Sequence, residues 1–181
     1  MFDVVGLAAF KGSGKTTLAK YLEEKGFIRV SFADPLRELL ELQNPYLRSD
    51  SGVRPLQEVL LQHDWQSLKT SEYSEQIRDL MVNTGKSLRA VDEDFFVRVA
   101  HERVAKLLED SERIVIDDVR FPNEATFISN LGGALIRITR PSVTNGDNPD
   151  VSELQNFPVH FTINNDGYLY NLYDQADHIL L

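Results

Sequence analysis

The feature that most constrains the fold is the segment Ala9-Phe10-Lys11-Gly12-Ser13-Gly14-Lys15-Thr16, which lies between two elements of different periodicity. The apolar run at residues 4–8 predicts a strand buried on both faces. Residues 16–25 predict a helix that ends at Gly26. A glycine-rich turn between such a strand and such a helix is typical of a phosphate-binding loop, because backbone N–H groups and the helix N-terminus surround an anion. The sequence therefore predicts an α/β protein that binds a nucleoside triphosphate.

The loop residues have separate expected roles. Glycine at positions 12 and 14 allows the backbone to approach a phosphate closely. Lys15 is expected to reach the β- and γ-phosphates, and the Thr16 hydroxyl is expected to face Mg²⁺. The strict motif begins with glycine where this chain has Ala9, and alanine is tolerable there because the critical turn lies later. The expected ligand is ATP with Mg²⁺, bound by Gly12, Ser13, Gly14, Lys15, Thr16 and Thr17.

The rest of the chain alternates between strand and helix patterns, which favours a mostly parallel α/β sheet. Further strands are predicted at residues 27–32, 113–118, 134–138 and 161–163. Helices are predicted at residues 34–42, 122–131 and 168–179, and residues 55–110 are predicted to be mainly helical. Polar loops are expected at 43–53 and 141–149.

A pair of acids stands at the end of the predicted strand at 113–118. An aspartate at the carboxyl end of a buried parallel strand lies beside the phosphate loop in such sheets, where it can hold Mg²⁺. Either Asp117 or Asp118 could have this role, and either could instead cap the following loop. The sequence favours a metal-side role for one of them and does not say which.

Arginines are the third element of the predicted site, because phosphoryl transfer requires cations that neutralise both substrates. Arg120 directly follows the acid pair and is the best candidate. Arg140 precedes the longest loop rich in Gly and Pro, where a closing lid is expected. Arg78 and Arg98 fit solvated salt bridges better. An Asn-Lys-x-Asp guanine-binding motif is absent, so a small kinase is favoured over a GTPase switch.

Composition limits the other classes. The chain has 181 residues, 42% hydrophobic residues, no cysteine and a net charge of −9 at pH 7. Zero cysteine excludes disulfides, thiol nucleophiles and Cys-based metal sites. Such an acidic chain is not expected to bind nucleic acid or an acidic membrane surface. No apolar run is long enough to span a bilayer, so a cytoplasmic protein is expected.

Several further motifs carry a family resemblance over nearly the whole chain. They begin with Ser31-Phe32-Ala33-Asp34-Pro35-Leu36-Arg37, and continue with Arg78-Asp79-Leu80, Asn83-Thr84-Gly85, Arg89 and the stretch at residues 91–97. Residues 118–125, Gly132-Gly133, Ser152-Glu153 and residues 163–167 complete the order. Together with the phosphate loop, they resemble the phage-type deoxynucleoside monophosphate kinases, a nucleoside monophosphate kinase branch of P-loop proteins.

The resemblance implies transfer of the ATP γ-phosphoryl group to a deoxynucleoside 5′-monophosphate, with Mg²⁺. It implies a P-loop fold, with a five-stranded parallel sheet flanked by helices. Residues 1–181 would form a single kinase domain, with a helical acceptor-binding region at about 34–100 and a lid at about 139–153. A viral origin, the host cytoplasm and a homodimer are also expectations drawn from the family.

The same resemblance assigns roles to individual residues. Lys15, Asp118, Arg120 and Arg140 are expected to act in catalysis, with Arg140 on the lid and Thr16 and Asp118 on the metal. Relatives often have aspartate where this chain has Thr16, so their metal geometry does not transfer directly. Acceptor binding is expected from Asp34, Arg37, Arg78, Arg89, Arg120 and Glu153.

The sequence leaves two other functions open. Animal-type phosphomevalonate kinase shares the framework and would use the same chemistry on another phosphate acceptor. A regulatory protein that hydrolyses ATP slowly would need the phosphate loop but not the arginines on the acceptor side. The sequence does not name the base that the acceptor carries, nor does it separate deoxyribose from ribose.

Overall fold

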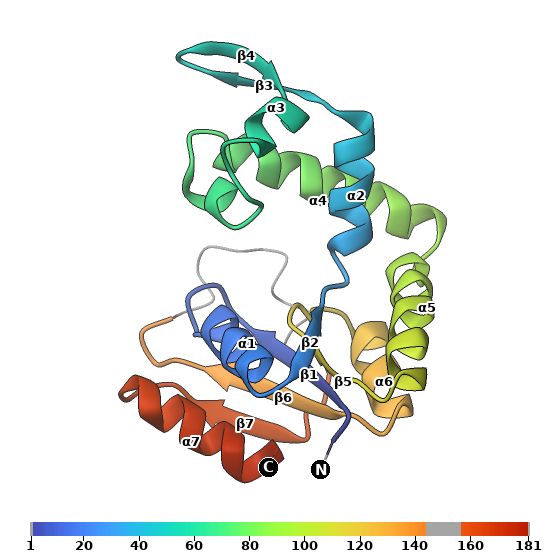
Figure 1. Cartoon of the computed structure of the whole chain (residues 1–181), viewed down its shortest axis with the longest axis vertical. Helices are drawn as coiled ribbons and strands as arrows, with labels where there is room; N and C mark the ends of the chain where they lie inside the picture. Colours follow the sequence, from blue (N-terminus) through green and yellow to red (C-terminus); the bar gives the residue numbers. More distant parts are fainter. Residues whose placement is uncertain (1, 144–156, 181) are drawn as a thin grey trace. The chain divides into compact units, whose positions relative to one another are not determined.

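The computed structural model describes residues 2–143 and 157–180, which form two compact units (Figure 1). The first unit comprises Met1–Phe32 and Val97–Leu181. The second comprises Ala33–Phe96. The predicted acceptor-binding region at 34–100 overlaps the second unit in sequence.

The first unit is built on a five-stranded sheet with the order β2-β5-β1-β6-β7. Every neighbouring pair of strands is parallel. This arrangement confirms the predicted five-stranded parallel α/β fold, and the five strand positions agree with the sequence patterns. The strands are β1 (Val4–Ala9), β2 (Phe27–Val30), β5 (Arg113–Ile116), β6 (Ala134–Thr139) and β7 (Phe161–Asn164).

Helices cover both faces of this sheet, as parallel sheets require. Along β1, Val5 and Leu7 face the core that contains Leu18 of α1 (Lys15–Glu24) and Leu172 of α7 (Leu169–Leu180). The intervening Gly6 faces Ile128 of α6 (Pro122–Asn130), because successive strand residues point to opposite faces. Helix α5 (Phe95–Glu109) packs near α6, with the rings of His101 and Phe127 6.1 Å apart.

The second unit has its own core. Its elements are α2 (Asp34–Gln43), β3 (Tyr46–Ser49), β4 (Gly52–Pro55), α3 (Leu56–Leu60), η1 (Ser67–Thr70) and α4 (Ser74–Val91). The prediction of a loop at 43–53 is wrong, because β3 and β4 pair there as an antiparallel hairpin. The hairpin is held by Leu47, which is buried with Leu40, Leu56 and Leu68. A single buried residue in a short polar segment is too weak a signal for sequence analysis to detect.

None of the described helices could cross a membrane, since none combines sufficient length with sufficient apolar character. The longest, α4, has 18 residues and contains Arg78, Asp79, Lys86 and Arg89.

Candidate active site

The carboxyl ends of the parallel strands meet at one edge of the sheet, and the polar loops of the first unit follow those ends. The phosphate loop follows β1, the acid pair follows β5, and Ser31 follows β2. Arg140 follows β6, and Asn165 follows β7. The predicted site residues of this unit therefore share one edge, and two further polar side chains join them there.

The phosphate loop has the backbone that its glycines predict. Gly12 and Gly14 have φ angles of 87° and 100°, in the left-handed region that disfavours other residues. The N–H of Ser13 donates to the carbonyl of Phe10 at 3.2 Å and closes the turn. Gly14 is the N-cap of α1, and no side chain caps this helix end. The N–H groups of the first turn are therefore directed at a site that can accept an anion.

A buried hydroxyl in this loop calls for a ligand. The Ser13 side chain is 0% exposed, and its Oγ has no hydrogen-bond partner among the described residues. A buried polar atom without a partner costs free energy, and native structures contain few of them. An oxygen of a bound phosphate would supply the partner, so this side chain fits the expected triphosphate.

Asp118 is held in its charged form beside the loop. Its side chain is buried, with Oδ2 accepting from Ser31 Oγ at 2.6 Å and Oδ1 accepting from the Phe32 N–H at 2.8 Å. Burial alone would raise the pKa of Asp118, but the positive charge of Lys15, the Ser31 hydroxyl and the charge of Arg120 together hold it below the usual value of 3.8. A carboxylate that stays ionised beside Lys15 is suited to hold a divalent cation, directly or through water.

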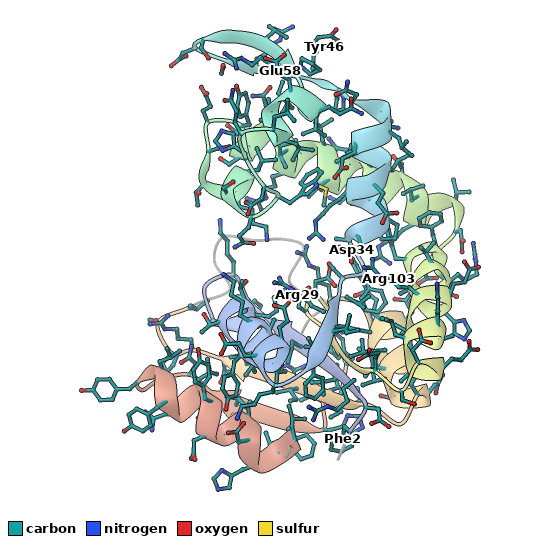
Figure 2. All side chains as sticks on the ribbon, in the orientation of Figure 1. Phe2, Arg29, Asp34, Tyr46, Glu58 and Arg103 are labelled. Carbon is teal, nitrogen blue, oxygen red and sulfur yellow. The ribbon has the colours of Figure 1, made fainter. Side chains whose placement is uncertain are left out.

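Asp117 has a different partner. Its Oδ2 accepts from Nε of Arg29 at 2.9 Å, and a second Arg29 nitrogen, Nη2, pairs with the same oxygen. Arg29 lies on β2 and is labelled in Figure 2. Its Nη1 also lies 3.8 Å from Oε2 of Glu23. The charge of Asp117 is thus already compensated by an arginine. Of the two acids that the sequence left open, Asp118 is the one whose negative charge the phosphate-loop lysine stabilises.

Two predicted arginines lie in the same unit. The Arg120 side chain is exposed, and its positive charge acts on Asp118. Its backbone N–H donates to Oε2 of Glu124 at 2.7 Å. Arg140 donates from Nη1 to the carbonyl of Gly12 at 3.4 Å, so it reaches the phosphate loop. Beyond Val143, the predicted lid lies outside the described residues, and so does Glu153.

Sequence reasoning missed three supporting residues. Ser31 and Glu124 were seen only as parts of motifs, although each accounts for the placement of a site residue. Asn165 was likewise named only within the motif at residues 163–167; its Nδ2 donates to the carbonyl of Ser13 at 2.9 Å. The available signal was position, since Ser31 stands near the end of the predicted strand at 27–32 and Asn165 stands shortly after the predicted strand at 161–163. The carboxyl ends of parallel strands meet at one edge of a sheet.

The second unit holds the other predicted residues. Arg37 donates to Asp34, one turn earlier on α2, at 2.5 Å. Arg89 lies over the ring of Phe96, at 4.6 Å from its centroid, and donates to the carbonyl of Glu93 at 3.5 Å. Arg78 is exposed on α4. Asp34 is labelled in Figure 2 at the start of α2.

The described residues contain no group of three or more acidic, histidine or cysteine side chains that could hold a metal ion by themselves. Mg²⁺ usually binds through one or two protein oxygens together with substrate phosphates, so a hydroxyl and a carboxylate suit it. Thr16, at the start of α1, and the ionised Asp118 would be the protein donors.

Comparison with known proteins supports this description. No protein-family model matches the chain. A "Putative deoxynucleotide monophosphate kinase" of Acanthamoeba polyphaga mimivirus is 37% identical over 161 residues, which cover 84% of this chain and 82% of the viral protein. The solved dephospho-CoA kinase from Campylobacter jejuni has the same fold, with a TM-score of 0.56 and 15% identity over 99% of this chain and 96% of that one.

The fold, the phosphate loop and the mimivirus relative together identify a P-loop kinase. Within that class, the chain belongs to the deoxynucleotide monophosphate kinase family represented by the mimivirus protein. Membership confirms the resemblance that the sequence motifs carry, and it implies ATP as the phosphoryl donor.

Proposed function

We propose that this protein transfers the γ-phosphoryl group of ATP to a deoxynucleoside 5′-monophosphate in the presence of Mg²⁺, giving a diphosphate and ADP. The observation that carries the proposal is a phosphate loop whose helix start has no side-chain cap, together with a buried Asp118 whose negative charge Lys15 stabilises. The name of the mimivirus relative supports the choice of acceptor class.

The chain's own residues account for the charge changes of such a transfer. Lys15 and the first-turn N–H groups of α1 would bind the β- and γ-phosphates, and Arg140 would add charge from the end of β6. Thr16 and Asp118 would hold Mg²⁺, which withdraws charge from the phosphates. Arg120 would bind the phosphate that moves between the two substrates. An oxygen of the acceptor phosphate attacks the γ-phosphorus in line, so no covalent enzyme intermediate is needed.

No general base is required, because the acceptor phosphate is already an anion at neutral pH. Asp118 therefore acts as an ionised ligand and not as a proton acceptor, in agreement with its lowered pKa. On the acceptor side, the proposal assigns binding to Arg37, Arg89 and Asp34, with Arg78 and Glu153 as further contacts.

The test is ATP-dependent phosphorylation across a panel of dAMP, dGMP, dTMP, dCMP, the four ribonucleotides and phosphomevalonate. Diphosphate formed from one or more deoxynucleotides, with a preference over the ribonucleotides, is the expected result. Product from phosphomevalonate alone would move the protein to that activity. ADP release that is equal with and without acceptors would identify a regulatory ATPase.

A matched pair of arginine variants tests the acceptor side. Arg89→Ala is expected to raise KM for the monophosphate about tenfold or more, since it removes a cation from a phosphate, and to leave KM for ATP unchanged. Arg48 lies on β3 and is exposed, so Arg48→Ala is the control and is expected to behave as the wild type. Equal effects of the two variants would argue against Arg89 as an acceptor ligand.

A further inference from the structure

Asn165 connects an edge strand of the sheet to the phosphate loop. It is the first residue after β7, and its backbone N–H donates to the carbonyl of Thr139 at 2.8 Å. Its side-chain Nδ2 donates to the carbonyl of Ser13 at 2.9 Å. Strand β6 lies between β7 and β1 in the sheet, so this side chain reaches past one strand to the loop that follows β1.

The bond to the Ser13 carbonyl fixes a particular peptide unit. A trans peptide is planar, and its C=O and N–H point in opposite directions. The described chain contains no cis peptide bonds, so the N–H of Gly14 points away from Asn165. Holding the carbonyl of Ser13 therefore also sets the direction of the Gly14 N–H, one of the donors at the start of α1.

Without a constraint, this peptide could rotate. Glycine adopts positive and negative φ with similar ease, so the peptide that precedes Gly14 has alternative orientations. A Cβ atom added at position 14 would overlap Nδ2 of Asn165. The glycine therefore provides both the left-handed backbone and the space that the Asn165 amide occupies.

We propose that Asn165 is a positioning residue for the triphosphate: it selects the orientation of the Ser13–Gly14 peptide that presents the Gly14 N–H to a phosphate oxygen. This inference rests on the proposed function for its ligand, and it concerns the phosphate chain and not the nucleoside. Asn165 acts through the loop and does not touch the reacting atoms.

The experiment compares Asn165→Ala and Asn165→Asp with the wild type in binding ATP and inorganic tripolyphosphate, each with Mg²⁺, by titration calorimetry. Asn164→Ala is the control: its side chain accepts from Thr139 Oγ1 at 2.6 Å, within the same segment. Asn165→Ala is expected to raise both Kd values about tenfold, the effect of one hydrogen bond. Asn165→Asp is expected to do so at least as strongly, because a carboxylate would face the Ser13 carbonyl. Both Kd values of Asn164→Ala are expected to stay within twofold of those of the wild type. Such a difference is smaller than the loss of a hydrogen bond to the phosphate loop would cause.

Kinetics supply a second readout. A positioning role predicts a raised KM for ATP in the Asn165 variants and an unchanged KM for the acceptor, with thermal unfolding of the ligand-free protein close to that of the wild type. Weaker binding of ATP with unchanged binding of tripolyphosphate would mean that the side chain acts on the nucleoside, and would overturn the proposal. Unchanged binding of both ligands, or failure of both variants to fold, would overturn it as well.

The binding measurements also separate this inference from the proposed function. Tripolyphosphate binding requires no acceptor and no turnover. A wild-type protein that phosphorylates no monophosphate would refute the proposed function, while the loss of tripolyphosphate affinity in Asn165→Ala would still support the role of Asn165.

Discussion

Ser31 and Asp118 join the carboxyl ends of two neighbouring strands through one hydrogen bond, from Ser31 Oγ to Asp118 Oδ2 at 2.6 Å. Ser31 follows β2 and Asp118 follows β5, and these strands pair in parallel. The carboxylate is buried and charged, so the hydroxyl compensates part of its lost hydration. The strand pairing thus sets the chemical state of a site residue.

The bond predicts a pH-dependent effect of Ser31→Ala. The pKa of Asp118 in the folded protein lies below the usual 3.8, so its contribution to stability is present above that pH and is lost as the pH falls through the lower folded value. Ser31→Ala raises this pKa and is expected to lower the free energy of unfolding at pH 7 by about 1 kcal/mol. Urea unfolding at pH 7 and at pH values below 3.8 checks it. A difference from the wild type that does not narrow in acid would contradict this account of Asp118.

The adjacent acids predict opposite phenotypes. Asp118→Asn removes the charge beside Lys15 and is expected to lower kcat about 100-fold, with a modest change in stability. Asp117→Asn weakens the pair with Arg29 and is expected to cost about 1–3 kcal/mol of stability while kcat stays within about threefold. Steady-state kinetics and thermal unfolding of both variants test this prediction. If Asp117→Asn lowered kcat and Asp118→Asn lowered stability, the roles proposed for the two acids would be exchanged.

Lys15→Ala is expected to abolish phosphoryl transfer, with a loss of at least 100-fold in kcat, because the proposed function places this cation at the transferring phosphate. Lys15 is half-buried at the start of α1, and alanine is the best helix former, so circular dichroism should show an unchanged fold. Turnover like that of the wild type would exclude the loop as the phosphate site.

Glu124 predicts a linked loss of stability and activity. Its buried carboxylate accepts from the N–H groups of Arg120 and Phe121 at 2.7 and 3.1 Å. Glu124→Ala is expected to lower the free energy of unfolding by about 1–2 kcal/mol. It is also expected to lower kcat, because Arg120 would be displaced. Glu124→Gln keeps an acceptor oxygen, so it is expected to retain most of the stability and most of the kcat of the wild type. If kcat fell equally in the two variants, the charge of Glu124 and not its hydrogen bonds would be responsible.

Sequence patterns predicted most of the first unit and less of the second. The buried runs at β1, β5 and β6 are apolar on both faces, which distinguishes them from other elements. The hairpin β3–β4 lies in a stretch that contains Asn44-Pro45 and Ser51-Gly52, and these turn-forming pairs favour a loop over a strand. Its pairing depends on Leu47 entering a core that is formed with residues of α2, α3, η1 and α4.

The parts of the candidate site that form from one short motif could be predicted from the sequence. The parts that depend on contacts between distant segments could not. The eight residues that end with Gly14-Lys15-Thr16 are sufficient to predict a phosphate loop. The choice between Asp117 and Asp118, in contrast, depends on Arg29, which is 88 residues away from Asp117. The contact between Asn165 and Ser13 spans 152 residues. Such choices are fixed by strand order, which no local pattern in one sequence reveals.

The N-terminus of α1 has no side-chain cap, so a bound ligand would complete its hydrogen bonding. Gly14 supplies no capping side chain, and the first turn contains no acidic residue, so a bound phosphate would be the cap that this helix lacks. Binding to the folded state alone raises stability with the logarithm of ligand concentration. The susceptibility of this protein to proteolysis should therefore follow the supply of nucleotide, and an enzyme with abundant substrate should persist longer than one without it.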